Sequence, residues 1–538
     1  MAGFNNTPVS IELGGAEIVA WVPGAKVAAV CGGDNTVRFV KYDANFQNPE
    51  VVLEKEFNGD IQSVAAYGNH FAVAESSDKA EKGRVSVYHF NSTKNTLRRR
   101  FSAKVGYLPD SVSWSPDGKT IVVANEGEPN DYYGTADEID PEGSISILRL
   151  GDDKKSLKQV KTLGFGGFTA AQLKDAGVRL SGENADSPAK DIEPEFVKIT
   201  PDSKRAVVTL QENNAMVVVN LETGTLETPT GLGSKDWSGL SVDTSDKDGG
   251  YLPGDRDFKS LYMPDGMDVF TASNGTSYAV MANEGDGRVR PDDVNFEATA
   301  GGTFTLSRHR VKKGHKALAQ IEDPMTGKNI YVHKGLRGKD STAFEAEAGD
   351  EFFITRKYGA VADDDFYSDE KRAGKLDGPQ GNSIVSGDGE GRLKTVVDQN
   401  TADSITGFGG RSFTIRDLDG NIAWDSGDDL DRIAAEYDVY DDGRSDDKGV
   451  EPEHVEIATL GDRSFAFISL ERGISTLIPV YEITNVDAPE HVYTFHAANS
   501  VAPEATEFVK TSANGGTLLV SSEKSGTLDA FNFSTSLV

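Results

Sequence analysis

The chain has 538 residues, a formal net charge of −31 and one cysteine, and 37% of its residues are hydrophobic. That charge repels nucleic acid phosphates and anionic membrane surfaces and attracts cations, so nucleic acid is excluded as an expected partner. The apolar runs have the length of strands, far below the roughly 20 residues needed to cross a bilayer, so no membrane span is expected. Cys31 cannot form an internal disulfide, and we expect it to be a small buried side chain.

Seven segments share one design, in which a short strand, a polar turn, a second apolar strand and an acidic or Gly-rich break are followed by a further strand. They begin at Gly15, Gly59, Leu108, Ile192, Met263, Val450 and Ala502. Their strands, such as residues 207–210 and 217–219, are short and β-branched, and the turns "SPDGK" and "TPDSK" carry Pro and Asp. Repeats too small to bury their own faces predict radial closure. We therefore predict an all-β fold, a single seven-bladed β-propeller over residues 11–538, in which the first strand meets the last repeat.

Two longer segments interrupt this pattern. Residues 151–191 form a short insert with one helix candidate, "TAAQLKDAG". Residues 288–444 are predicted to be a long insertion in the fifth blade. Within it, "RSFTIRDLDG" and "NIAWDSGDD" are interpreted as outer strands of that blade around a "DLDGN" hairpin turn. The remainder is predicted to cap one face, and a small separate subdomain is the alternative.

The ordered segments "VANEGEPND", "DIEPEFVKITPDSKRAVVTLQENN", "GGRSFTI", "DGNIAWDSGDD" and "VEPEHV" resemble the choice-of-anchor I family. The resemblance runs from Gly15 to about Phe533. It implies a secreted or surface propeller; some members are described as mesenchyme-specific cell surface glycoprotein-like, others as atypical alkaline phosphatases. The chain departs from the family in two respects. The signal peptide and C-terminal anchor that family members often carry are not expected from the two ends of this sequence, and "VVDQNTADSITGFGG" replaces a calcium-loop-like run of aspartates before "SFTI".

Carboxylates recur at two positions of the repeats. One precedes the first strand of several repeats, after a proline: Asp110, Glu195, Asp265, Glu453 and Glu504. The other follows the second strand: Glu126, Glu212, Glu284, Glu471 and Glu523. The start of a strand and the end of its hairpin partner lie at the same edge of a sheet. The spacing therefore predicts an acidic ring at one mouth of the propeller channel.

Two interpretations of the ring stay open. In the first, a hard divalent cation such as Ca²⁺, with a second divalent metal as an option, is bound by carboxylate and amide oxygens. The ligands predicted for it are Glu126, Glu128, Asp131, Glu195, Glu212, Glu284 and Glu453. In the second, each Glu accepts backbone N–H bonds from the neighbouring blade and locks the blades together. The segments "EGEPND", "DKDGG" at Asp246 and "SDDKG" at Ser445 are the richest in acids, and they mark the predicted functional mouth.

Two functional classes follow from this ring. The first is an extracellular or cell-surface calcium-binding propeller that binds partners or surface polymers. The second is a divalent-metal-dependent phosphoesterase acting on phosphate esters, with Lys247, Arg288, Arg444, Lys448 and Arg472 as candidates for binding phosphate oxygens. Salt bridges to the acidic ring are the alternative role for these five, and His454 is a candidate proton-transfer group for which a structural role is the alternative. No serine elbow, P-loop or "HExxH" motif is present, which sets aside serine hydrolase, nucleotide-driven and zincin chemistry.

The two ends of the chain bear on localisation. The start, "MAGFNNTPVSIELGG", has neither the basic residues nor the apolar core of a secretory signal. The end, "LDAFNFSTSLV", is interpreted as a signal for one-step export, with folding triggered by external Ca²⁺. The alternative is a closing strand with a frayed tail, in a cytoplasmic protein or one that has lost its signal.

Overall fold

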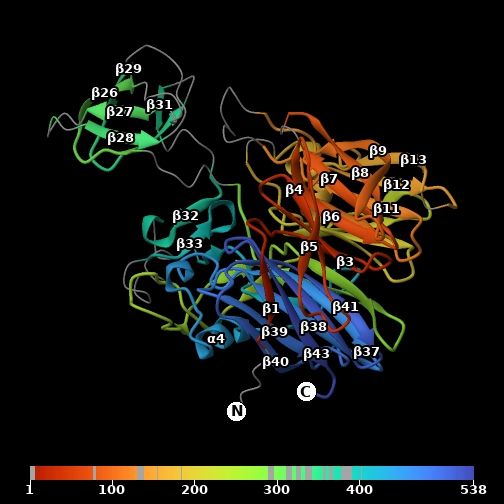
Figure 1. The fold of residues 1–538 in the computed structure, drawn as a ribbon. Coiled ribbons are helices and arrows are strands. Elements are labelled where there is room, and N and C mark those ends of the chain that lie inside the picture. The colour runs from red at the N-terminus through yellow and green to blue at the C-terminus, as the bar shows by residue number, and fades with distance from the viewer. Residues whose placement is uncertain are drawn as a thin grey trace. The chain divides into compact units, whose positions relative to one another are not determined.

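The computed structural model describes residues 7–76, 80–129, 139–153, 155–182, 185–288, 296–309, 318–322, 327, 329–333, 342–355, 359–362, 368–376, 391–401 and 403–538 (Figure 1). The chain forms two compact units. The first comprises Met1–Glu128, Asp140–Gly287 and Asp369–Val538. The second comprises Pro129–Ile139 and Arg288–Ser368.

The first unit is built from consecutive four-stranded antiparallel sheets. The first sheet contains β2 (Val19–Val22), β3 (Val27–Gly32), β4 (Thr36–Lys41) and β5 (Glu50–Glu56). The second contains β6 (Asp60–Tyr67), β7 (His70–Ser76), β8 (Lys82–Asn91) and β9 (Thr96–Tyr107). The third contains β10 (Ser111–Trp114), β11 (Thr120–Asn125), β12 (Ser144–Leu150) and β13 (Leu157–Gly164).

The later sheets vary this plan. The fourth contains β14 (Val197–Ile199), β15 (Arg205–Leu210), β16 (Ala215–Asn220) and β17 (Thr225–Leu226), with β18 (Thr230–Gly231) also on β16. The fifth joins β23 (Met267–Thr271) and β24 (Ser277–Asn283) to β35 (Ser412–Asp417) and β36 (Ile422–Asp425). The sixth contains β37 (Pro452–Leu460), β38 (Arg463–Leu470), β39 (Thr476–Glu482) and β40 (Glu490–Ala497). The seventh contains β41 (Pro503–Ser512), β42 (Gly515–Ser522), β43 (Thr527–Ser534) and β1 (Val9–Glu12).

The sheets pack face to face in chain order, and this order closes on itself. The first strands of neighbouring sheets contact one another from β2 through β6, β10, β14, β23 and β37 to β41, and β41 contacts β2 again. Strands such as β3 and β11 are buried along their whole length, because each sheet lies between two others. Phe39, Phe71 and Phe90, for example, share one hydrophobic cluster between the first two sheets. Cys31 is fully buried, as predicted. The architecture is all-β and propeller-like.

The N-terminal strand completes the last sheet. β1 pairs antiparallel with β43, with Val9 opposite Ala530 and Glu12 opposite Thr527, and Figure 1 draws this red strand among the blue ones. Ser10 also donates a hydrogen bond to the buried carboxylate of Asp529. The predicted meeting of the first strand with the last repeat is confirmed, and it removes an edge that would otherwise be open to pairing.

Short elements fill the connections of the first unit. The helix candidate "TAAQLKDAG" is α1 (Ala170–Asp175), which Thr169 begins with a capping box, so that prediction is confirmed. A small mixed sheet runs in the order β19 (Ser234–Asp236), β22 (Lys259–Leu261), β34 (Thr406–Gly407), β33 (Lys394–Val396) and β32 (Glu370–Arg372). The other elements are α2 (Pro188–Asp191), β20 (Ser241–Val242), β21 (Gly254–Asp255), η2 (Ala373–Lys375), η3 (Val397–Gln399), α4 (Asp429–Glu436) and η4 (Asp442–Arg444).

The second unit has its own small sheets. One contains β25 (Phe296–Glu297), β30 (Glu351–Thr355) and β31 (Gly359–Ala362). The other contains β26 (Gly302–His309), β27 (Leu318–Glu322), β28 (Asn329–His333) and β29 (Thr342–Ala346), and Phe304, Leu306 and Ile321 are buried in it. Residues 288–368 of the predicted insertion thus belong to the second unit, whereas β32 to β36 belong to the first. A capping role stays a prediction. None of the helices among the described residues is long and apolar enough to span a membrane.

Candidate functional site

One cavity of about 420 Å³ lies where the first strands of the sheets begin. Each sheet contributes the residue at the equivalent position, just before or within the start of its first strand, and all of them line the cavity: Glu17, Gln62, Asp110, Glu195, Asp265, Glu453 and Glu504. The ends of the second strands add further lining carboxylates, Glu284, Glu471 and Glu523. The lining holds ten carboxylates and one guanidinium, that of Arg472.

Carboxylates from neighbouring sheets meet closely around this cavity. Four groups of three, with their oxygens within 4.8 Å of one another, surround it: Asp110 with Glu126 and Glu195, Asp265 with Glu284 and Glu453, Glu284 with Glu451 and Glu471, and Glu471 with Glu504 and Glu523. The charge of Glu212 also acts on Glu126. The two repeated carboxylate positions therefore do converge on one rim, as predicted, and such groups have the oxygen ligands that Ca²⁺ takes.

Crowding shifts the protonation of these groups. Burial, with nearby carboxylates as a further cause, raises the pKa of Asp110 to about 7 and that of Glu504 to about 9. Burial likewise raises the pKa of Asp265 and of Glu471 to about 8. Several carboxylates of the ring thus share protons near neutral pH unless a cation takes the place of the protons.

The group formed by Asp110, Glu126 and Glu195 differs from the rest. Within the described residues, no hydrogen bond or ion pair engages these three side chains, and Oε2 of Glu195 is a buried oxygen without a hydrogen-bond partner. Burial, followed by neighbouring carboxylates, raises the pKa of Glu126 and of Glu195 well above the usual range. The predicted alternative, in which each acid accepts a backbone N–H from the next sheet, thus finds no donor at this group. Glu17, in contrast, accepts a backbone N–H from Gly33.

Lysine and arginine neutralise another part of the ring. Nζ of Lys448 lies 2.9 Å from Oε1 of Glu284 and 3.1 Å from Oε2 of Glu451. Burial favours the neutral amine, but these carboxylates outweigh it and raise the pKa of Lys448 well above its usual range. Arg472 pairs with Glu471 at 2.7 Å, and Arg444 pairs with Glu451 at 2.6 Å. The three cationic candidates are therefore bound to carboxylates of the ring or beside it.

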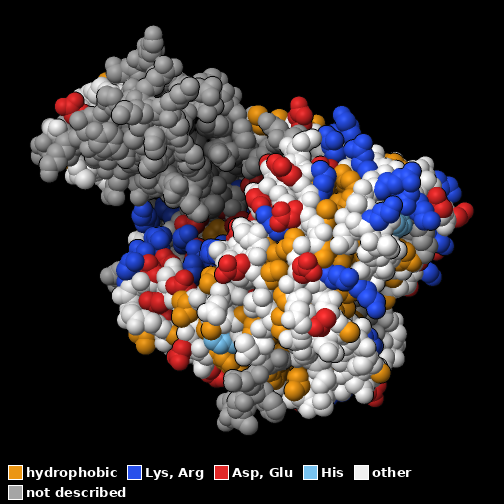
Figure 2. All heavy atoms as spheres, in the orientation of Figure 1, with side chains coloured by type: hydrophobic (Ala, Val, Ile, Leu, Met, Phe, Trp, Pro, Cys, Tyr) orange, Lys and Arg blue, Asp and Glu red, His pale blue; other side chains and the backbone are white. Residues whose placement is uncertain are grey.

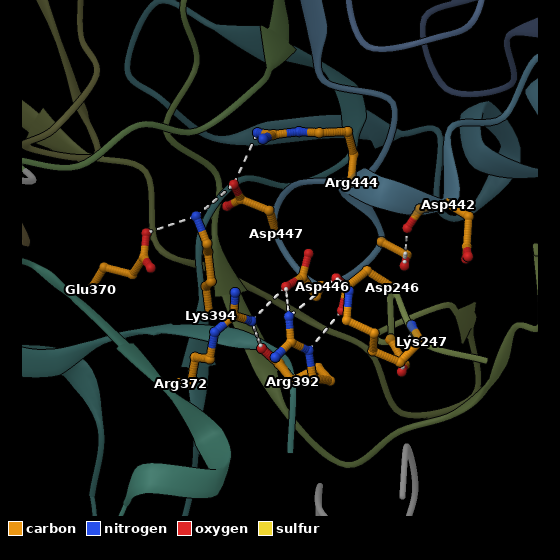
Figure 3. Close-up of polar contacts among 12 residues, drawn as sticks. Asp246, Lys247, Glu370, Arg372, Arg392, Lys394, Asp442, Arg444, Asp446 and Asp447 are labelled. Carbon is orange, nitrogen blue, oxygen red and sulfur yellow. Dashed lines mark hydrogen bonds and ion pairs between the residues drawn. The ribbon is translucent and has the colours of Figure 1, made fainter. Parts of the chain in front are cut away.

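A polar network continues outward from Arg444 (Figure 3). Asp447 forms an ion pair with Arg444 at 2.9 Å and accepts a hydrogen bond from Lys394 at 3.0 Å. Lys394 also pairs with Glu370, which reaches it from β32 at 3.0 Å. Lys394 was not among the predicted site residues, because no repeat or motif marks this part of the chain.

The two acid-rich motifs at Asp246 and Ser445 come together in the same network. Nε of Arg392 donates a hydrogen bond to Asp246 at 2.7 Å. Arg392 also forms an ion pair with Asp446, and Arg372 forms another with the same carboxylate. Burial disfavours the charged form of Asp246, but the hydrogen bonds from Arg392 and Lys247 lower its pKa to about 2. Figure 3 shows Arg392 joined by dashed lines to Asp246 of one motif and Asp446 of the other. The local charge there is therefore mixed, unlike that of the ring.

His454 lies in the wall of the cavity. Its ring is 5% exposed, its Nδ1 is 2.9 Å from Oγ1 of Thr506, and it meets Phe196 with ring centroids 5.3 Å apart. Burial, with the nearby charge of Lys198 as a lesser cause, lowers its pKa well below the usual range. The imidazole of His454 is therefore neutral, and its role in proton transfer stays a prediction.

The other predicted site residues lie apart from these pairs. Lys247 is half-exposed and pairs with its neighbour Asp246 at 2.6 Å. Arg288 is buried and belongs to the second unit. Glu128 acts electrostatically on Asp110 and Glu126. Asp131 lies outside the described residues.

Four members of the ring were missed, namely Glu17, Gln62, Asp286 and Glu451. Glu17 stands in "AEIVAW" and Gln62 in "DIQSVAAY", and neither follows the Pro-acid pair that marked the others. Alignment of these segments with "PDSVSW" at Asp110 would have found both. Gln62 is neutral, so the ring is interrupted at the second sheet.

The fold and the ring define an all-β, propeller-like protein with an acidic central cavity. The model of the choice-of-anchor I domain matches residues 17–486, and the chain belongs to this family. It is 27% identical over 128 residues to the mesenchyme-specific cell surface glycoprotein of Strongylocentrotus purpuratus, a match that spans 23% of this chain and 16% of that protein.

Comparison of this chain with solved structures gives low TM-scores. Sqt1 of Saccharomyces cerevisiae has a TM-score of 0.43 and 9% identity, with 98% of each chain covered. A putative 6-phosphogluconolactonase of Bacteroides fragilis has a TM-score of 0.43 and 11% identity, with 100% of this chain and 94% of that one covered.

Proposed function

We propose that this protein is a seven-bladed surface β-propeller that binds Ca²⁺ in its acidic mouth and uses the rigid mouth to bind a partner or a surface polymer. The carrying observation is the group Asp110, Glu126 and Glu195, whose carboxylates lie within 4.8 Å of one another with no cationic partner among the described residues. Like charges this close are stable as carboxylates only when a cation lies between them. Membership of the choice-of-anchor I family and the match to a cell surface glycoprotein support a surface location.

Ca²⁺ suits these ligands better than the alternatives. The group is made of oxygens alone, and no described cysteine or histidine belongs to it, which disfavours Zn²⁺. A rim assembled from separate sheets also suits the flexible coordination of Ca²⁺ better than the strict octahedron of Mg²⁺. Each bound ion would join two sheets, since Asp110 and Glu126 come from the third sheet and Glu195 precedes the first strand of the fourth.

Metal retention tests this proposal directly. Protein exchanged into Ca²⁺ and then dialysed is expected to retain stoichiometric Ca²⁺ by elemental analysis, and calorimetric titration should show saturable binding. The variant Glu126→Gln/Glu195→Gln should lose at least one equivalent, because two anionic ligands are replaced by neutral amides. Glu490→Gln, at an exposed site on the outer strand β40, is the matched control and should retain all Ca²⁺. Equal retention by the ring variant and the control would exclude this group as the binding site.

A metal-dependent phosphoesterase is the second candidate. The observation in its favour is the position of Arg472, which lines the cavity together with the carboxylates, so that bound metal and a guanidinium would flank one substrate phosphate. Release of phosphate from a chromogenic monoester, abolished by EDTA and reduced at least tenfold by Arg472→Gln, would support it. Absence of release in the presence of Ca²⁺, Mg²⁺ or Mn²⁺ would leave the non-catalytic proposal.

A further inference from the structure

A basic surface lies on the second sheet of this acidic protein. Arg98 and Arg100 stand near the start of the outer strand β9, and Lys155 precedes β13, which contacts β9. Figure 2 shows Lys and Arg side chains gathered over the part of the first unit where Figure 1 labels β8, β9 and β13. We name as the basic surface Arg98, Arg100 and Lys155 together with the histidines His70 and His89.

The strand register brings these groups to one face. His70 pairs with His89 across β7 and β8, and His89 pairs with Arg98 across β8 and β9, so the three side chains lie side by side. The two imidazole rings are 5.1 Å apart. The pKa of His70 is lowered to about 4, first by burial and then by the nearby groups His89, Arg100 and Lys155. Asp153 has a smaller effect in the opposite direction. The field at this place is therefore positive despite the net charge of the chain.

The cations of the basic surface are only partly compensated: the carboxylate of Asp153 lies near Lys155, and the charge of Lys155 is one of the causes that lower the pKa of Asp153. Among the described residues, no ion pair engages Arg98, Arg100 or Lys155. Three buried nitrogens nearby also have no hydrogen-bond partner: Nε of Arg100, Nε2 of His70 and Nε1 of Trp114. His70 and Trp114 are each 8% exposed, and their rings are 6.5 Å apart. Unsatisfied buried nitrogens are rare in folded proteins, and next to cations with few counter-charges they point to an anionic ligand.

We propose that the basic surface binds an anionic polysaccharide through its carboxylate or sulfate groups. Arg98 and Lys155 are exposed and can reach such groups, and Arg100 offers a guanidinium whose planar fork matches an oxyanion. Nucleic acid fits less well. A duplex carries one charge per about 1.7 Å and would extend from this small surface over the strongly acidic remainder of the protein. A polysaccharide with one charge per sugar has a lower charge density and is repelled less.

This site is separate from the acidic mouth. Gln62 marks the mouth at the start of β6, whereas Tyr67 at the other end of β6 pairs with His70. Five residues of extended strand separate the two positions by roughly 17 Å. Loss of Ca²⁺ binding at the mouth and loss of polysaccharide binding at the basic surface can therefore be measured independently.

The proposal is tested by binding to two immobilised polymers, heparin, which carries sulfate, and polygalacturonate, which carries carboxylate. Neutral dextran serves as a blank and oligothymidylate as a competitor. The variant Arg98→Gln/Lys155→Gln changes only exposed side chains. It is expected to weaken binding of at least one polymer about tenfold and to reduce the slope of log affinity against log salt by about two. Arg84→Gln/Lys104→Gln removes the same charge from exposed side chains nearer the other end of β8 and β9 and should bind as the wild type does.

Each result decides the matter. The proposal is supported if the first variant loses affinity while the control and the mouth variant Glu126→Gln/Glu195→Gln do not. It is overturned if neither polymer binds, if both charge pairs lower affinity equally, or if oligothymidylate displaces the polymers at equal charge concentration. Two-dimensional NMR adds a readout on the site itself, because an anion beside His70 and His89 should raise their pKa values, an effect that dextran should lack.

Discussion

Replacing Glu504 by Gln should stabilise the metal-free protein at alkaline pH. Its carboxyl has a folded pKa of about 9, raised by burial and by Glu471 and Glu523, against about 4.3 in an unfolded chain. The folded state holds a proton that the unfolded state releases between these values, so stability is fully present below about pH 4 and is lost as pH rises towards 9. Gln keeps the shape of the protonated side chain and does not titrate.

The magnitude follows from this linkage. At pH 8 the upper limit is about 1.4 kcal/mol for each of the roughly 3.7 pH units above the unfolded pKa, or about 5 kcal/mol. The neighbouring carboxylates share protons with Glu504, so we expect about 2 kcal/mol. With an unfolding entropy of about 2.1 cal/mol/K per residue, 538 residues give about 1.1 kcal/mol/K. The thermal midpoint in EDTA should therefore rise by about 2 °C at pH 8 and by less than about 0.5 °C at pH 5, which is only about 0.7 pH units above the unfolded pKa.

Scanning calorimetry or intrinsic fluorescence in EDTA from pH 5 to 9 measures this effect. Glu490→Gln, at an exposed position, is the control and should follow the wild type. Ca²⁺ at about 100 times its dissociation constant should add about 2.7 kcal/mol to both proteins, because Glu504 is not part of the proposed site at Asp110, Glu126 and Glu195, so the advantage of the variant should remain. A midpoint for Glu504→Gln below that of the wild type in EDTA at pH 8 would refute the charge repulsion argument.

Two further perturbations act on other parts of the fold. Lys448→Met leaves Glu284 and Glu451 without their buried cation, which should cost about 3–5 kcal/mol of stability and lower the thermal midpoint in EDTA by about 3–5 °C. Arg432→Gln, in an exposed pair, should change the midpoint by less than about 1 °C. Equal midpoints for the two variants would contradict the role assigned to Lys448. Deletion of residues 1–12 removes β1 and exposes the edge of β43, so light scattering should detect self-association. Deletion of residues 1–7, which leaves β1 in place, should not cause it. A monomeric product of the longer deletion would count against a closing role for β1.

The repeats predicted most of the fold and the rim because both depend on local patterns. Short β-branched strands and Pro-Asp turns mark each hairpin, and the strand "SFTI" predicted for the fifth sheet does pair with β24 as β35. Hairpin geometry brings the two repeated carboxylate positions of one sheet, such as Asp110 and Glu126, to the same edge. The approach of carboxylates from neighbouring sheets, such as Glu195, depends in addition on the predicted radial closure.

Salt bridges to the ring were one of the two predicted roles of Arg444, Lys448 and Arg472, and the structure shows them. The cations of the outer network could not be predicted in the same way. Lys394 and Arg392 lie in a stretch without repeat signals. Lys394 contacts Asp447, which is 53 positions away in the sequence, and Arg392 contacts Asp246, which is 146 positions away. The helix α4 was missed too, since it lies in a segment interpreted as part of an excursion. Such pairs depend on how the connections fold back over the sheets, and no periodicity records that.

The distribution of charge around the ring argues that it is more than a repeated structural device. Repetition explains why every sheet has a polar residue at the same position, but it does not explain why the charges are balanced unequally. Lys448 and Arg472 neutralise the side of the ring that holds Glu284 and Glu471, and Gln62 leaves the second sheet neutral. The group Asp110, Glu126 and Glu195 has no such compensation within the described residues. A ring that served only to join sheets would be neutralised evenly, whereas one uncompensated group in a partly neutralised ring is what a single cation site requires.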